Sequence, residues 1–151
     1  TLNQKGKLDL GMYIEKITTS EAKVAVVWAG TMPYFVDRNY VDLLGKNDRK
    51  IARMKMRTFD QTDPKKFSAN NITKSRYTFF YPGHLKWDYA YSIGQLKPDV
   101  IVFIWAGRKE AMPYLKNDYI PIANIVIRRN SKNIKWDKLT KPLQSSQNRL
   151  L

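Results

Sequence analysis

The chain has 151 residues, no cysteine and a formal net charge of +14. Its length suits one domain with its own core, because domains most often have about 100–150 residues. The absence of cysteine excludes disulfides, thiol catalysis and cysteine-bound zinc. No apolar run approaches the roughly 18–20 residues that a membrane-spanning helix needs. The sequence therefore predicts a single domain over residues 1–139, with a loose polar tail at 140–151.

Helix and strand patterns alternate at the start of the chain. Apolar residues at helical spacing predict an amphipathic helix over Lys5–Ile17. The β-branched run Lys23–Trp28 predicts a buried strand. After Gly30, which breaks this strand, residues 32–35 are expected to form one helical turn. A short strand is expected at residues 40–44.

The next part of the chain is polar and basic. Asn47 or Asp48 is a suitable N-cap for a helix that ends near Met56. Residues 57–76 show little periodicity and predict a long basic loop, followed by an extended segment at 77–81. Residues 46–76 hold ten basic and three acidic side chains, and residues 128–149 hold seven and one. A field of this sign attracts polyanions, whether nucleic acid, anionic lipid or a phosphorylated small molecule.

The last third of the folded part returns to strands. Apolar spacing predicts a helix from His84 to Leu96, and Val100–Trp105 predicts a second buried strand. Residues 119–122 and 124–129 are expected to form an antiparallel pair at the sheet edge. The order predicts an α/β fold: a small, mostly parallel sheet flanked by helices, with the antiparallel pair at its C-terminal edge.

Two loops rich in glycine, proline and aromatic residues carry the candidate ligand-binding residues, the first at residues 28–48 and the second at residues 81–88. Such loops at the ends of rigid elements often hold binding groups. The candidates are Tyr34, Asp42, Asp48, Gly83, His84, Lys86 and Asp88.

Three of these residues suggest a specific chemistry. His84 and Lys86 are expected at a helix start, where backbone N–H groups favour a phosphate or carboxylate. Asp42 lies on an apolar strand, so its carboxylate needs a partner, for which Lys86 or an arginine is available. The alternative is that His84 and Asp48 only cap helices.

The patterns of several enzyme classes are missing. The chain has no three-glycine dinucleotide fingerprint, no phosphate-binding Gly-Lys-Ser/Thr loop and no serine-hydrolase elbow. Asp42, Asp48, His84 and Asp88 could donate to a divalent ion, but their spacing is not diagnostic. We therefore expect no metal site and no cofactor.

The two loops resemble the C-terminal region of bacterial multi-spanning glycosyltransferases related to protein O-mannosyltransferases and lipid A aminoarabinose transferases. The resemblance covers roughly residues 8–131. It is carried by Ala29-Gly30, Pro33-Tyr34-Phe35, Asp42-Leu43-Leu44-Gly45, Asp48, Ile51-Ala52, Pro82-Gly83-His84, Lys86-Trp87-Asp88, Tyr91, Pro98-Asp99 and residues 127–130 (IRRN).

This resemblance implies an accessory extracytoplasmic (periplasmic) domain at the bacterial inner membrane, as a fragment of a longer protein. Its partners would be the transmembrane bundle of the same chain and an anionic membrane surface or a polyprenyl-phosphate sugar. In that superfamily the catalytic acidic residue lies in the membrane portion, so this chain alone would not be catalytic. The alternative is a stand-alone basic module for nucleic acid or another polyanion. Nucleic acid is the less favoured partner, because no RNP, KH or zinc-finger motif is present.

Overall fold

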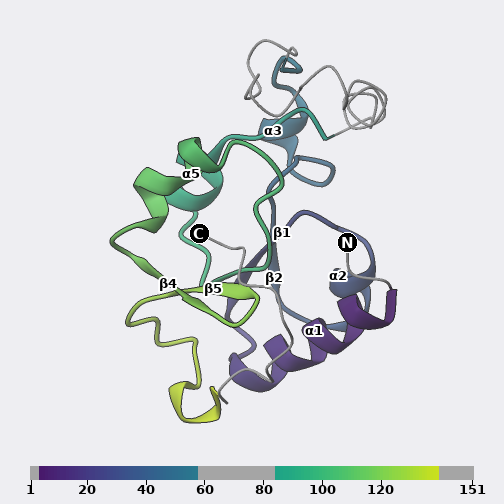
Figure 1. The fold of residues 1–151 in the computed structure, drawn as a ribbon. Helices are drawn as coiled ribbons and strands as arrows, with labels where there is room; N and C mark the ends of the chain where they lie inside the picture. The colour runs from purple at the N-terminus through teal and green to yellow at the C-terminus, as the bar shows by residue number, and fades with distance from the viewer. Residues whose placement is uncertain (1–3, 58–83, 140–151) are drawn as a thin grey trace, which may run out of the picture.

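The computed structural model describes residues 4–57 and 84–139. Within them, a five-stranded mixed sheet of order β2-β1-β3-β5-β4 forms the centre of the molecule (Figure 1). The predicted α/β class is therefore confirmed. Gly83, most of the predicted basic loop, the extended segment at 77–81 and the tail at 140–151 lie outside the described residues.

The sheet has a parallel half and an antiparallel half. β1 (Lys23–Val26) runs parallel to β2 (Asn39–Asp42) on one side and to β3 (Val100–Ile101) on the other. β5 (Ile125–Arg128) runs antiparallel to both β3 and β4 (Tyr119–Ile122). The predicted antiparallel pair at the C-terminal edge is confirmed.

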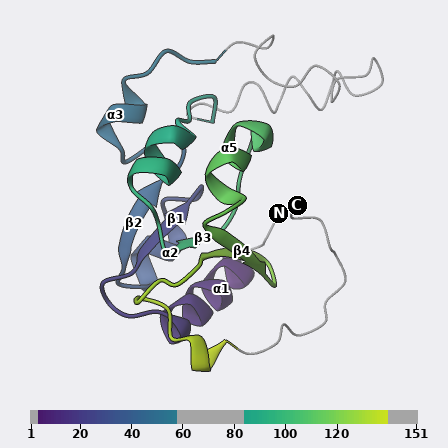
Figure 2. The same ribbon diagram turned by 90° about the vertical axis from the view of Figure 1, so that its left-hand side faces the viewer.

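Helices cover both faces of this sheet (Figure 2). On one face α1 (Gln4–Ile17) packs with α2 (Thr31–Phe35). On the other face η4 (Ala90–Gln95), a π-helix, packs with α5 (Arg108–Leu115). Two short elements complete the described fold, α3 (Arg49–Ala52) after β2 and the 3₁₀ turn η5 (Trp136–Lys138).

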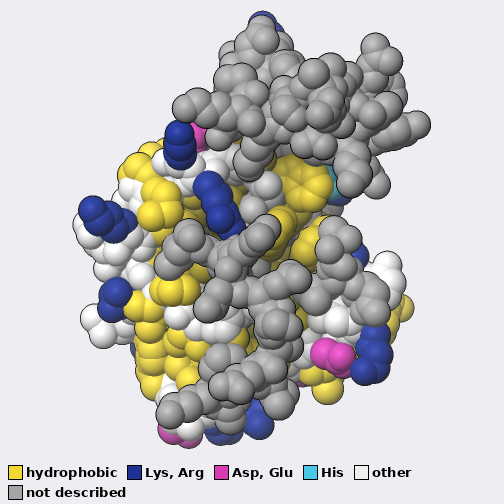
Figure 3. Space-filling model, in the orientation of Figure 1, with side chains coloured by type: hydrophobic (Ala, Val, Ile, Leu, Met, Phe, Trp, Pro, Cys, Tyr) yellow, Lys and Arg dark blue, Asp and Glu magenta, His cyan; other side chains and the backbone are white. Residues whose placement is uncertain are grey.

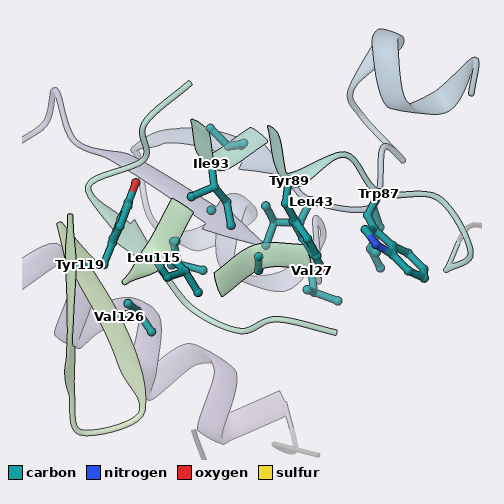
Figure 4. Close-up of a cluster of buried hydrophobic side chains, with 13 residues drawn as sticks. Val27, Leu43, Trp87, Tyr89, Ile93, Leu115, Tyr119 and Val126 are labelled. Carbon is teal, nitrogen blue, oxygen red and sulfur yellow. The ribbon is translucent and has the colours of Figure 1, made fainter. Parts of the chain in front are cut away.

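The alternation of side chains along the strands explains the two cores. Val24 and Val26 of β1 pack with α1 on one face, and Ala25 faces the other. That second core contains Trp87, Tyr89 and Ile93 from the chain around η4, together with Leu115 of α5 (Figure 4). A strand with apolar residues on both faces is typical of a parallel sheet covered by helices on each side.

Several predicted boundaries need correction. The strands predicted to reach Trp28, Leu44 and Trp105 end earlier. They end at Val26, Asp42 and Ile101, respectively. There the chain turns away to form the loops at the carboxyl ends of the three parallel strands, called here the carboxyl edge of the sheet. The helix predicted to end near Met56 stops at Ala52.

The helix predicted from His84 begins later and has a different geometry. Residues 84–88 are not helical, and η4 covers only Ala90–Gln95. Asp88, not His84, acts at its start, since an Oδ1 atom of Asp88 accepts the backbone N–H of Tyr91 at 2.9 Å. The hydroxyl of Ser92 also donates to the carbonyl of Asp88 at 2.7 Å. A wider π turn has no distinct signal in the apolar periodicity.

The amino ends of β1 and β3 are joined by one buried carboxylate. Asp99 accepts hydrogen bonds from the backbone N–H of Lys23 at 2.8 Å, the hydroxyl of Ser131 at 2.6 Å and the side-chain amide of Asn133 at 3.0 Å. Arg128 forms an ion pair with the same carboxylate. Three segments far apart in the sequence therefore meet at Asp99, at the edge opposite the predicted binding loops.

Candidate functional site

The carboxyl ends of β1 and β3 form the place where ligands are expected in this kind of fold. The chain leaves β1 toward α2 on one face of the sheet and leaves β3 toward α5 on the other. In open α/β sheets, ligands bind outside the carboxyl ends of neighbouring strands whose connections diverge in this way. The two segments that diverge here are residues 27–30 and 102–107.

Aromatic side chains line this point of divergence. Trp28 and Phe103 stack with ring centroids 5.5 Å apart and an interplanar angle of 9°. Trp105 lies 6.5 Å from Phe103 and 5.1 Å from the imidazole of His84. The repeated Trp-Ala-Gly sequence at residues 28–30 and 105–107 thus follows two parallel strands at the same edge. A carboxyl edge lined by partly buried rings offers apolar surface to a ligand.

Asp42 has a structural role that differs from the expected one. Its carboxylate is buried and accepts three backbone N–H groups, those of Leu44 at 2.9 Å, Gly45 at 3.1 Å and Asn47 at 2.6 Å. Lys86 does not pair with Asp42 as expected but donates to the carbonyl of Ala52. Within residues 4–57 and 84–139, no arginine forms a salt bridge with Asp42. The residue shapes the loop after β2, and its carboxylate is turned into that loop.

Asp48 and Asp88 are brought together through two residues that the sequence did not single out as ligand-binding candidates. Asp48 caps α3, as predicted, by accepting the N–H of Ile51 at 2.9 Å, and it accepts the hydroxyl of Tyr91 at 3.3 Å. Lys50 lies 3.8 Å from the carboxylate of Asp88 and 3.9 Å from the centre of the Tyr91 ring. The sequence does offer a signal for these two residues, because Lys50 lies on the helix that Asp48 caps and Tyr91 follows soon after the second loop.

These four residues form what is called here the carboxylate–lysine cluster: Asp48, Lys50, Asp88 and Tyr91. Within it, the tyrosine acts as a hydrogen-bond donor. Partial desolvation, together with the negative charges of Asp48 and Asp88, raises the pKa of the Tyr91 hydroxyl. The hydroxyl therefore remains protonated at neutral pH and can donate to Asp48. The cluster joins the first loop to the second, so the two sequence motifs do lie side by side.

His84 and Lys86 also reach this edge, but not at a helix N-terminus. His84 is buried against Trp105, and Lys86 donates from Nζ to the carbonyl of Ala52, the last residue of α3, at 2.6 Å. Since the helix begins after Asp88, the anion site expected from a helix start at His84 does not form there. Gly83 lies outside the described residues.

Tyr34 lies apart from the carboxylate–lysine cluster in its contacts. Its side chain is 82% exposed on α2 and packs edge-to-face on Phe35, with centroids 4.9 Å apart. Phe35 is itself 58% exposed. Tyr34 therefore remains available for contact with a partner.

The segment from Lys46 to Arg57, called here the basic segment, gives the edge its charge. It holds six basic residues and one acidic residue, Asp48. Five of the cations have exposed side chains, namely Lys46, Arg49, Lys50, Arg53 and Lys55. Arg57 is partly buried, where it pairs with Glu110 at 2.9 Å and lies 4.3 Å from the Trp87 ring. Most of the segment's charge therefore faces solvent.

Two absences hold for the part of the chain that the structure describes. Residues 4–57 and 84–139 contain no group of three or more histidine, aspartate or glutamate side chains placed to hold a metal ion. Over those same residues, no helix has the length and apolarity needed to cross a membrane.

Comparison with known proteins gives a family but no activity. No curated protein and no solved structure matches the chain. A family model described as a domain of unknown function (DUF8728) matches residues 2–141, which is nearly the whole chain. The chain belongs to this family, DUF8728.

Proposed function

We propose that this chain is a non-catalytic accessory domain of a membrane glycosyltransferase and that its basic segment rests on an anionic membrane surface. The domain would lie on the extracytoplasmic face of the bacterial inner membrane, beside the transmembrane bundle of the same protein. The resemblance of its two loops to glycosyltransferases that use polyprenyl-phosphate donors supports this placement. In this role the domain binds lipids that carry a phosphate group.

The observation that carries the proposal is the exposure of the basic segment. Lys46, Arg49, Arg53 and Lys55 have no ion-pair partner among residues 4–57 and 84–139. Clusters of four to eight basic residues attract anionic lipid head groups, and each contributes about 1 kcal/mol near the surface. Unpaired cations need no competing bond to be broken before they contact a phosphate.

An exposed apolar side chain strengthens the case for a lipid surface. Met56 is 58% exposed at the end of the basic segment. A basic surface that also presents an apolar side chain suits the boundary between head groups and acyl chains. The polyprenyl-phosphate head of a sugar donor has the same phosphate chemistry, so the same cations can hold it.

A vesicle-binding experiment tests the proposal. The protein is mixed with phosphatidylcholine vesicles that contain or lack phosphatidylglycerol, and the bound fraction is measured by sedimentation. The variant carries Lys46→Gln, Arg49→Gln, Arg53→Gln and Lys55→Gln. Removal of four surface cations is expected to weaken binding to the anionic vesicles on the order of 100-fold or more.

A matched control separates the basic segment from the net charge. Lys16, Lys116, Lys132 and Lys138 are also exposed, so their change to glutamine removes the same charge elsewhere. This control is expected to bind several-fold more tightly than the basic-segment variant. Equal loss in the two variants, or equal binding to neutral and anionic vesicles, would contradict the proposal.

The same protein can be used to test the alternative function, a stand-alone module that binds nucleic acid or another polyanion. A single-stranded oligonucleotide is titrated at low and moderate salt, because counterion release makes such binding steeply salt-dependent. Binding of the oligonucleotide without binding of anionic vesicles would favour the stand-alone module. The gene sequence around this chain tests the glycosyltransferase part, for which several apolar spans in the same protein are expected.

A further inference from the structure

An apolar pocket lies between the chain that follows β3 and the helix α5. Its volume is about 170 Å³. Residues of β3, β5 and α5 line it, together with Phe103 and Ile104 from the chain after β3. Of the residues that the sequence singled out for ligand binding, none of those within the described ranges lines this pocket.

The position of the pocket fits a binding site. It lies where the chain leaves β3 at the carboxyl edge, next to the ring of Phe103 that stacks on Trp28. This edge, where the connections of β1 and β3 diverge, is where α/β sheets generally bind ligands. Met112 contributes a side chain that is 39% exposed, so one wall of the pocket reaches the surface.

The size and lining define the buried part of a ligand. A cavity of about 150 Å³ lined by leucine, isoleucine and phenylalanine stays dry and binds benzene. The pocket here is of similar volume, and apart from Arg108 and Lys109 the described residues that line it are apolar. It therefore suits a hydrocarbon group of about the size of benzene and does not suit a sugar or a nucleotide base.

The charge at the pocket defines the other part of the ligand. Arg108 and Lys109 line it from the first turn of α5, and none of the acidic residues that the structure describes lines it. The nearby Glu110 is engaged elsewhere, since its carboxylate pairs with Arg57 at 2.9 Å and accepts the indole N–H of Trp87 at 3.3 Å. Figure 3 shows basic and hydrophobic side chains next to one another on the side where Figure 1 draws α5.

We propose that this pocket binds a small anionic amphiphile. Its hydrocarbon group enters the space between Phe103 and Met112, and its carboxylate or phosphate contacts the cation of Lys109. The site is distinct from the basic segment and does not depend on membrane docking. It adds a small-molecule ligand to a domain otherwise proposed to hold lipid head groups.

Titration of the whole 151-residue chain with octanoate tests this site by calorimetry. Octanol, acetate and octyltrimethylammonium serve as probes that lack the charge, lack the chain or reverse the charge. Octanoate is expected to bind more tightly than all three. In methyl-labelled protein, octanoate is expected to shift the signals of Met112 and Leu115 and not those of Ile14, which lies in the opposite core.

Two substitutions on α5 locate the contacts. Lys109→Glu is expected to weaken octanoate binding by about fivefold or more, as loss and reversal of a surface charge contact predicts. Lys116→Glu, at the other end of the helix and away from the pocket, is expected to change it less than twofold. Met112→Trp replaces a partly exposed side chain by a larger one and is expected to abolish binding by filling the pocket.

These outcomes separate the pocket from the proposed membrane surface. Met112→Trp leaves the basic segment unchanged, so vesicle binding is expected to persist when octanoate binding is lost. Equal binding of octanoate and octyltrimethylammonium would overturn the proposal. Octanoate binding that survives Met112→Trp, or no octanoate binding at all, would also overturn it whatever the vesicles show.

Discussion

At the scale of single residues, Asp42 illustrates how a buried carboxylate can organise a loop instead of a ligand. Its two oxygens accept the N–H groups of Leu44, Gly45 and Asn47, all within five residues along the chain. A carboxylate that accepts several backbone N–H groups is satisfied without any cation. The loop after β2, which carries the start of the basic segment, is therefore fixed by this one side chain.

Asp42→Ala is expected to lower the free energy of unfolding by about 2–4 kcal/mol, because it leaves partly or fully buried N–H groups without an acceptor. Asp42→Asn keeps one acceptor oxygen and should have a smaller effect. Urea unfolding followed by circular dichroism measures both. Asp9→Ala removes an exposed carboxylate on α1 and should cost less than about 0.5 kcal/mol. A cost for Asp42→Ala as small as that of Asp9→Ala would contradict this role.

The sequence shows that Asp42 is unusual but does not show which groups donate hydrogen bonds to its carboxylate. A carboxylate on an apolar strand must be satisfied, and this much follows from sequence. Whether a side chain or the backbone satisfies it depends on how the chain turns after the strand. The N-cap at Asp48 was predictable, because a capping side chain accepts a backbone N–H only two or three residues further along the chain. Its bond to Tyr91 was not, since that contact joins residues 43 positions apart.

At the scale of elements, Gly45 connects β2 to the basic segment. It has a φ of 73°, which L-residues with a side chain rarely adopt. A Cβ placed there would lie 2.5 Å from a methyl carbon of Ile51 and 2.8 Å from the backbone nitrogen of Ala52. The loop and α3 can pack this closely only because residue 45 has no side chain.

Gly45→Ala is expected to destabilise the domain by about 2–4 kcal/mol, through backbone strain and overpacking against α3. Thermal unfolding provides the measurement. Gly30→Ala is the comparison, since a Cβ at Gly30 meets nothing within 4 Å and its φ is −111°. If the two alanine variants unfold at the same temperature, the close packing of Gly45 on α3 has no energetic consequence.

The success of sequence reasoning differed between elements for a physical reason. Strands β1, β4 and β5 are predictable because β-branched and apolar runs of strand length are local signals. Helix α5 gives no clear signal in the sequence, because Pro113 lies inside it and lacks the N–H that an interior helical residue donates. The late start of η4 is not predictable, because apolar spacing marks a helical face but not the turn at which hydrogen bonding begins.

At the scale of the whole molecule, the two edges of the sheet have different tasks. The carboxyl edge carries the aromatic side chains, the basic segment and the apolar pocket. The amino edge is held by Asp99, which joins the start of β1 to the chain that follows β5. Such a division allows the loops at the carboxyl edge to change in sequence while the sheet is held from the other side.

The stability of the whole domain should therefore depend on the charge of Asp99. Burial alone would raise the pKa of Asp99, but hydrogen bonds from Ser131, the backbone of Lys23, Arg128 and Asn133 outweigh it and hold the pKa below its usual range. A carboxyl group whose pKa is lowered on folding contributes stability above its unfolded pKa of about 3.9, and this stability is lost as pH falls through the folded pKa.

Asp99→Asn should accordingly flatten the acid limb of the stability curve. Urea unfolding at a series of pH values from about 6 to 3 is expected to show a steeper fall of the unfolding free energy in the natural protein than in the variant. The variant should also be less stable at neutral pH, since the amide cannot replace the charged partner of Arg128. Asp118→Asn changes an exposed carboxylate beside β4 and should leave the slope intact. Parallel curves for the natural protein and Asp99→Asn would show that the acid sensitivity of the fold arises elsewhere and that the amino edge is not held by this charge.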